Sequence, residues 1–148
     1  MHSYRIRIFV LGVCAVLLAS CGVLNAKPRP AVTLKTVRLN KEFTLSEEQR
    51  VTLKGISFWI KFVAVESDSR CPSDVNCVWA GNAAVQVEVS TGRRSKTLTF
   101  NTGRSAALVS AIEYKSYRIK LVDLSPYPRS DRKIARGDYA ATLLVTKE

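Results

Sequence analysis

Short runs in which apolar and polar residues alternate fill the chain from Val32 onward, a pattern typical of β-strands with one buried face. Residues 85–89 alternate cleanly, a turn follows at 90–95, and Leu98 and Phe100 resume the alternation, which predicts a hairpin. Further strands are predicted at the following ranges: 43–45, 51–53, 117–121 and 139–146.

The run 56–65 is apolar on both faces, because Trp59 and Val63 alternate with Phe58, Ile60, Phe62 and Ala64. A strand of this kind is expected at the centre of a sheet. Residues 106–112 offer the one helical interpretation, and 125–137 predict a long loop. The chain is therefore expected to be all-β, as a small sandwich or open barrel of six to seven mostly antiparallel strands.

The N-terminal segment has the pattern of an export signal. Arg5 and Arg7 precede the apolar run 8–18, which ends in Leu18-Ala19-Ser20-Cys21. This ending resembles the bacterial lipobox, in which the cysteine is acylated, with palmitate among its chains, and becomes the first residue. The resemblance implies a signal peptide at 1–20, a tether at 21–31 and a single β domain at 32–148.

Two other interpretations of this segment stay open. Cleavage after Ala26 would release a secreted protein, although Leu24 is bulky where a small residue is wanted. Residues 8–26 carry no charge and are long enough for an uncleaved membrane span. In the lipoprotein interpretation the domain lies in the cell envelope, facing the periplasm or the exterior. Gly22 after the cysteine favours the outer membrane over the inner one.

The chain is basic, with a formal net charge of +11. Loss of Arg5 and Arg7 with the signal lowers Lys+Arg from 23 to 21 against 12 Asp+Glu, which leaves +9. That charge favours lipid headgroups, lipopolysaccharide phosphates, acidic polymers or an acidic protein as partners. Nucleic acid would fit the charge alone, but the expected compartment argues against it.

Cys71 and Cys77 are the two cysteines left after Cys14 and Cys21 are assigned to the signal and the lipid anchor. A pair of cysteines in an exported chain predicts a disulfide, here closing a loop of seven residues. Such a loop contributes roughly 2–2.5 kcal/mol in the chain-entropy account. A metal site is the weaker alternative, because His2, the only histidine, leaves with the signal.

The stretch 68–82 around this pair is the most distinctive part of the sequence. Gly81 would permit a backbone turn that a side chain blocks. Trp79 is expected to cover the disulfide and to be at least half buried, with an exposed ring for stacking on sugar as the alternative. A calcium site from Asp68, Asp74 and Asn76 is a further alternative, although their spacing matches no EF-hand.

The blocks Ser69-Arg70-Cys71-Pro72 and Cys77-Val78-Trp79-Ala80-Gly81 resemble those of a group of uncharacterised bacterial lipoproteins and secreted proteins. The segments 124–128 and 139–143 resemble the same group, and the resemblance spans about 43–145. It implies the β architecture and the envelope compartment, and it implies no reaction, cofactor or ligand.

Removal of the signal leaves no histidine and no methionine, so His-based acid–base catalysis, nucleophilic triads and blue-copper or His-rich zinc sites are not expected. Asp123, Asp131 and Asp138 offer paired carboxylates near one loop, but solvated ion pairs explain them more simply. We therefore expect a protein that is not an enzyme and that needs no cofactor and no metal.

The remaining candidate surface is basic. Long loops on a rigid β scaffold often bind partners, and the predicted contacts to an anionic partner are Arg129, Arg132, Lys133, Arg136, Arg93 and Arg94. A non-catalytic binding or accessory module of the envelope is the first hypothesis. An inhibitor of a secreted hydrolase is the second, with basic lysozymes disfavoured as targets by like charge. A purely structural envelope protein is the third.

Overall fold

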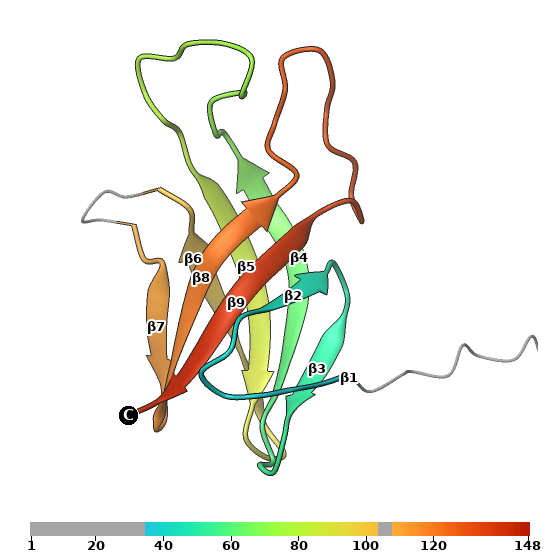
Figure 1. Cartoon of the computed structure of the whole chain (residues 1–148), viewed down its shortest axis with the longest axis vertical. Coiled ribbons are helices and arrows are strands. Elements are labelled where there is room, and N and C mark those ends of the chain that lie inside the picture. The colour runs from blue at the N-terminus through green and yellow to red at the C-terminus, as the bar shows by residue number, and fades with distance from the viewer. Residues whose placement is uncertain (1–34, 104–107) are drawn as a thin grey trace, which may run out of the picture. The chain divides into compact units, whose positions relative to one another are not determined.

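Two β-sheets make up the part of the chain that the computed structural model describes, residues 35–103 and 108–148 (Figure 1). One sheet has the order β1-β3-β4-β5-β6 and the other β2-β9-β8-β7. The strands are β1 (Lys35–Val37), β2 (Phe43–Ser46), β3 (Arg50–Leu53), β4 (Trp59–Asp68), β5 (Ala83–Ser90), β6 (Ser95–Asn101), β7 (Ala111–Tyr114), β8 (Tyr117–Ser125) and β9 (Ala140–Lys147). The predicted all-β class is confirmed.

The strand count exceeds the predicted six to seven because β1 and β7 are short strands at sheet edges. The helix expected at 106–112 is wrong over its described part. Ala111 and Ile112 instead pair with Lys120 and Ile119 of β8. Pairing with an existing strand edge overrides the helical preference of a short segment, since an isolated helical turn is marginal in water.

Strand pairing is antiparallel throughout the described residues except between β1 and β3. The predicted hairpin is formed by β5 and β6, with Val87 opposite Leu98. β4 occupies the middle of the five-stranded sheet, as the two apolar faces of its sequence indicated. Its pairing with β5 shifts register between Phe62 and Ala64.

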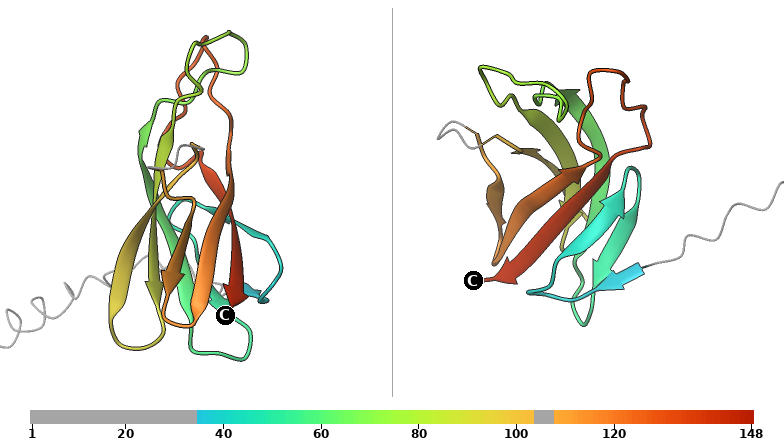
Figure 2. Two further views of the ribbon diagram at one scale, coloured as in Figure 1. Left: turned by 90° about the vertical axis from the view of Figure 1, so that its left-hand side faces the viewer. Right: turned by 45° about the horizontal axis from the view of Figure 1, so that its top comes forward.

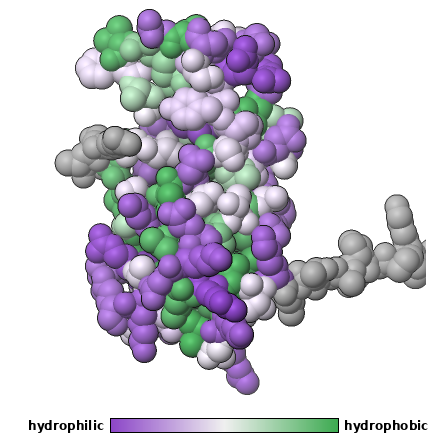
Figure 3. Space-filling model, in the orientation of Figure 1, coloured by the Kyte–Doolittle hydropathy of each residue, from purple (hydrophilic) through white to green (hydrophobic). Residues whose placement is uncertain are grey.

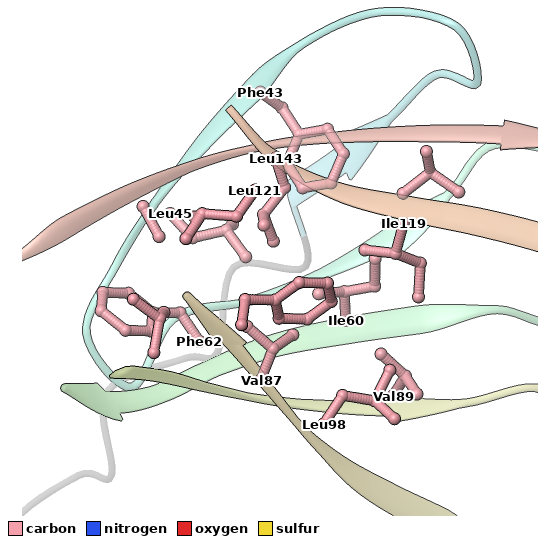
Figure 4. Packing of buried hydrophobic residues seen from close by; sticks show 14 of the residues in the cluster. Phe43, Leu45, Ile60, Phe62, Val87, Val89, Leu98, Ile119, Leu121 and Leu143 are labelled. Atoms are coloured by element: carbon pink, nitrogen blue, oxygen red, sulfur yellow. The ribbon is translucent and has the colours of Figure 1, made fainter. Parts of the chain in front are cut away.

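The hydrophobic core lies between the two sheets, where side chains from both inner faces interdigitate (Figure 4). Full burial of an aliphatic or aromatic side chain contributes about 1.5–3 kcal/mol relative to exposure. The largest fully buried side chains come from both sheets: Phe58, Phe62, Phe100, Leu45, Leu53, Ile60, Ile119, Leu124, Leu143, Val51, Val85 and Val87. Thr33–Glu148 forms one compact unit, so we expect this unit to fold without the preceding segment.

The two ends of the sandwich differ. The β4–β5 loop (69–82) and the β8–β9 loop (126–139) lie side by side at one end, which we call the head (Figures 1 and 2). The turns 38–42, 54–58, 91–94 and 115–116 lie at the opposite end, which we call the turn end. The two long loops therefore lie at one end of the sandwich, and these four short turns lie at the other.

Candidate functional site

The β4–β5 loop extends its hairpin beyond the sheet. The Ser69 amide donates to the Asn82 carbonyl at 2.7 Å, and the Cys71 amide donates to the Ala80 carbonyl at 2.9 Å. The Cys71–Cys77 disulfide, which the sequence predicted, closes the tip, with 5.9 Å between the two Cα atoms. Residues 73–80 are exposed in succession. The loop is thus a fixed projection, because backbone pairing and a covalent bond both constrain it.

Gly81 makes the close pairing of the two arms possible. Its φ of +71° lies in the left-handed region, and a Cβ at this position would meet the Ser69 carbonyl oxygen at 1.8 Å and the Arg70 Cα at 2.9 Å. A carbonyl oxygen and a Cα belong to the backbone and cannot move aside as a flexible side chain would. The expectation that Gly81 permits a turn blocked to other residues is confirmed.

A buried ion pair between Asp68 and Arg70 lies at the base of the head. The Arg70 Nε donates to Asp68 Oδ1 at 2.9 Å, and Arg70 Nη2 donates to Asp68 Oδ2 at 2.6 Å. The two side chains are 8% and 3% exposed. A bidentate contact of this kind is the strong form of an arginine–carboxylate ion pair.

The same guanidinium reaches the other sheet. Its Nη1 donates to the Leu124 carbonyl at 2.5 Å, and its Nη2 donates to the Pro126 carbonyl at 2.9 Å. Tyr139, immediately before β9, donates its hydroxyl to Asp68 Oδ2 at 3.3 Å. The pair therefore joins the end of β4 to the ends of β8 and β9, and it ties the two head loops together.

Two pKa shifts accompany this network. Burial raises the pKa of Asp68, but the hydrogen bonds and positive charge of Arg70 outweigh it and hold the pKa below the ordinary 3.8. Burial, followed by the negative charge of Asp68, raises the pKa of the Tyr139 phenol. Both directions favour an ionised Asp68 that accepts hydrogen bonds from Arg70 and from a neutral Tyr139.

The head loops meet a second time near the disulfide. The Ser73 amide donates to the Pro128 carbonyl at 2.9 Å. Asp74 accepts hydrogen bonds from the Ser130 amide at 2.9 Å and from its hydroxyl at 2.6 Å. These hydrogen bonds from Ser130 lower the pKa of Asp74. The head is consequently one cross-linked body rather than two independent loops.

The calcium alternative finds little support in these contacts. Both Asp68 oxygens face the Arg70 guanidinium, and both Asp74 oxygens face Ser130. Within residues 35–103 and 108–148, no group of three or more His, Cys, Asp or Glu side chains is placed to hold a metal ion.

Apolar side chains project from the head. Trp79 is 82% exposed and Val78 is 91% exposed, while Val75 and Tyr127 are about half exposed. Figure 3 shows hydrophobic surface at the top of the head beside strongly polar surface. The expectation that Trp79 is at least half buried over the disulfide is wrong, because the paired arms direct residues 73–80 into solvent.

The predicted basic residues divide between the two ends. Arg129, Arg132, Lys133 and Arg136 lie in the head, whereas Arg93 and Arg94 lie at the turn end, so the structure does not bring the six together. Arg129 donates to Asp131 at 3.1 Å. No ion pair within the described chain involves the other three head cations, which are exposed. The sequence indicated no role for Arg70, which lies at the base of the head.

A cleft of about 920 Å³ opens below the head between β6 and β8. Arg70, Gly81 and Tyr127 border it on the head side, and Lys120 and Asp123 border it on β8. Four of the five N–H groups that an arginine offers are already donated to Asp68, Leu124 and Pro126. Arg70 is thus used mainly to hold the two loops together. The centre of the Tyr127 ring lies 4.9 Å from the guanidinium carbon of Arg70.

Cys21 and the predicted signal peptide lie outside the described residues. In the part that the structure describes, none of the elements is a helix able to cross a bilayer. No protein-family model, no curated protein and no solved structure matches this chain.

Replacement of Gly81 by alanine should lower the free energy of unfolding by about 3 kcal/mol, because a left-handed φ and a backbone clash both oppose the new Cβ. Gly92→Ala is the matched control, since nothing lies within 4 Å of a Cβ there. Urea unfolding measures both variants. Equal stability of Gly81→Ala and the wild type would contradict the described pairing of the arms.

Acid should weaken the domain through Asp68. Its pKa is lowered on folding, so its contribution is present above the unfolded pKa of about 3.9 and is lost as pH falls below that value. Asp68→Asn should cost about 3 kcal/mol at neutral pH, because Arg70 stays buried without its counter-ion. The difference from the wild type should shrink below about pH 4.

Asp131→Asn, in the exposed pair with Arg129, serves as the control and should change stability little. Urea unfolding across the acid range measures all three proteins. A difference between Asp68→Asn and the wild type that stays constant with pH would refute the role given to the ion pair.

Proposed function

We propose that this domain is a non-catalytic binding module of the bacterial cell envelope, and that its head binds a protein partner. The observation that carries the proposal is Trp79, which is 82% exposed on a loop held by a disulfide, by Gly81 and by the Asp68–Arg70 pair. A large exposed ring on a rigid support has no packing role within the described domain. Its placement is the one expected of a contact residue.

Exposed apolar groups concentrate at the head. Of the six exposed large hydrophobic residues in the described chain, four lie there: Val75, Val78, Trp79 and Tyr127. Clustered exposed apolar surface marks interaction sites, and Trp, Tyr and Arg dominate the binding energy of protein interfaces. Because the loops are cross-linked before binding, little conformational entropy is lost on association.

Charge around this tip favours an acidic partner surface. Arg132, Lys133 and Arg136 lie exposed on the adjoining loop, while Asp131 is paired with Arg129 and Asp74 accepts from Ser130. Cations at the rim of an interface speed encounter and set specificity more than they add affinity. We therefore propose a partner with an apolar pocket bordered by carboxylates.

Three carboxylates in or next to the head have partners within the domain, which supports a role without catalysis. Asp68 and Asp131 are engaged by arginines and Asp74 by a serine, so none of the three is left as a ready acid or base. The proposed location in the envelope, with acyl chains on Cys21 and the outer membrane favoured, is supported by the lipobox resemblance and by the disulfide, which forms in oxidising compartments.

Inhibition of a secreted hydrolase is the second candidate. Eight consecutive exposed residues, 73–80, project from a constrained loop. A fixed projection of this kind fits a cleft without the entropy loss of a mobile peptide. This candidate uses the same head, and it is distinguished by whether the captured partner is a hydrolase whose activity the domain abolishes.

Site-specific photocrosslinking tests the proposal. A photoreactive phenylalanine analogue at position 79 of the full chain, activated in the native envelope, should give a discrete crosslinked protein. The same analogue at exposed Thr97 on β6 should not give that product. Identical products from both positions, or none from position 79, would contradict the proposed binding role and favour the purely structural hypothesis.

Affinity for the captured protein provides the quantitative test. Trp79→Ala should weaken binding by about 2–4 kcal/mol, as loss of an anchoring aromatic residue does, and Trp79→Phe should keep most of the affinity. Because Trp79 is mostly exposed, the melting temperature should not change. Calorimetric titration gives the dissociation constants, and equal values for Trp79→Ala and the wild type would exclude the tip as the binding site.

A further inference from the structure

The turn end gathers basic residues that are far apart in the sequence. All of them are exposed, and they come from four different turns: Arg38, Lys41, Lys54, Arg93, Arg94 and Lys115. Glu42 is the one acidic residue in the same turns. The folding of two sheets into a sandwich thus produces a positive pole that no single segment of the sequence displays.

Within residues 35–103 and 108–148, none of these six cations forms an ion pair. The ion pairs of the described residues involve Lys61, Arg70, Arg118 and Arg129. At the nearby C-terminus, Glu148 lies 3.8 Å from Arg118, and its amide donates to the Ser116 carbonyl. In the lower part of Figure 3, hydrophilic surface lies around smaller hydrophobic patches.

The head is less positive than the turn end. Its four cations, Arg129, Arg132, Lys133 and Arg136, share their loops with three acids, Asp74, Asp131 and Asp138. An extended anionic surface therefore attracts the turn end more strongly than the head. The short turns present their charges on a protruding pole, which suits a broad surface rather than a small ligand.

The start of the described chain favours a lipid surface as that partner. β1 runs from Lys35 to Val37 directly into the turn 38–42. About 14 residues separate Cys21 from this point, a reach of at most about 45–50 Å. Lys35 is paired with Val51 of β3, and Val51 is paired with Ile60 of β4, so Lys35 and Ile60 lie at the same height along the sheet. Asp68, at the head, is about 25 Å farther along β4. The described chain thus begins nearer the turn end than the head, and a bilayer held through acyl chains on Cys21 would lie within reach of the turn end.

We infer that the turn end binds the anionic headgroups of a lipid bilayer, so that the head points away from the membrane. The charge argument stands without the proposed function of the head, and the direction of approach uses the proposed lipid anchor on Cys21. Juxtamembrane Lys and Arg residues add their attractions to anionic lipid at short range. The sandwich then acts as a spacer with one pole for lipid and one for protein.

The test uses residues 33–148, the unit that carries the described core. Vesicles of phosphatidylcholine with added phosphatidylglycerol should retain this domain at low salt, and vesicles of phosphatidylcholine alone should not. The variant Lys54→Ser/Arg93→Ser/Arg94→Ser/Lys115→Ser should bind the anionic vesicles about a hundred-fold more weakly. Thermal melting confirms that each protein is folded.

A matched control removes the same charge from the other pole. Arg129→Ser/Arg132→Ser/Lys133→Ser/Arg136→Ser should lose about ten-fold or less, because those residues face away from the lipid. Equal losses in both variants would show that only net charge matters and would overturn the assignment. Absence of wild-type binding would overturn it as well, and stronger retention on polyglutamate than on vesicles would assign the pole to an acidic polymer.

Tryptophan emission reports the orientation. In a Trp59→Phe background Trp79 is the remaining tryptophan of this unit, and its emission should not shift when anionic vesicles bind. A blue shift would place the head in the bilayer and contradict the inference. The photocrosslinks from position 79 are independent of this result, so failure of the lipid assignment and failure of the head as a protein-binding site remain distinguishable.

Discussion

The buried pair of Asp68 and Arg70 is the interaction on which the head depends. A charge in this position is costly unless it is paired and hydrogen-bonded, and here four donated hydrogen bonds satisfy the guanidinium. Two of them cross from the β4–β5 loop to the carbonyls of Leu124 and Pro126. Because one side chain holds the ends of both sheets, the two long loops take a single arrangement, and the Ser73–Pro128 and Asp74–Ser130 contacts follow from it.

This constraint accounts for the exposed tip. Backbone pairing up to Cys71 and Ala80, the disulfide and Gly81 leave residues 73–80 no freedom to fold back over the sheet. Trp79 is therefore held in water, at a cost that a binding role would explain. The opposite pole carries charge instead of apolar surface. The proposed division, lipid at the turn end and protein at the head, rests on this difference in chemistry.

The fold was largely predictable because alternation with period two is a strong local signal. It identified β5, β6, β8 and β9 and the central place of β4. It missed β1 and β7, which are short and form strands by pairing with the edges of β3 and β8. The disulfide and the turn at Gly81 were also predictable, since each depends on residue type at a fixed spacing.

The candidate site was predictable only in part. The sequence indicated the disulfide loop and the basic residues, but Arg70 gained its role from Leu124 and Pro126, more than fifty residues away. Contacts between distant segments are not visible in the sequence, which explains why Trp79 was expected to be buried. It also explains why Arg93 and Arg94 were grouped with Arg129. Distances between loops are set by strand order, which local patterns do not encode.

Amide hydrogen exchange of the Ser73 and Ser130 N–H groups tests the central claim most directly, because each donates to the opposite head loop. In Arg70→Met, both amides should exchange at least about ten-fold faster than in the wild type, while the Val87 amide in the core of β5 keeps its protection. Unchanged protection of Ser73 and Ser130 in this variant would contradict the account, since the loops would then be held together without the ion pair.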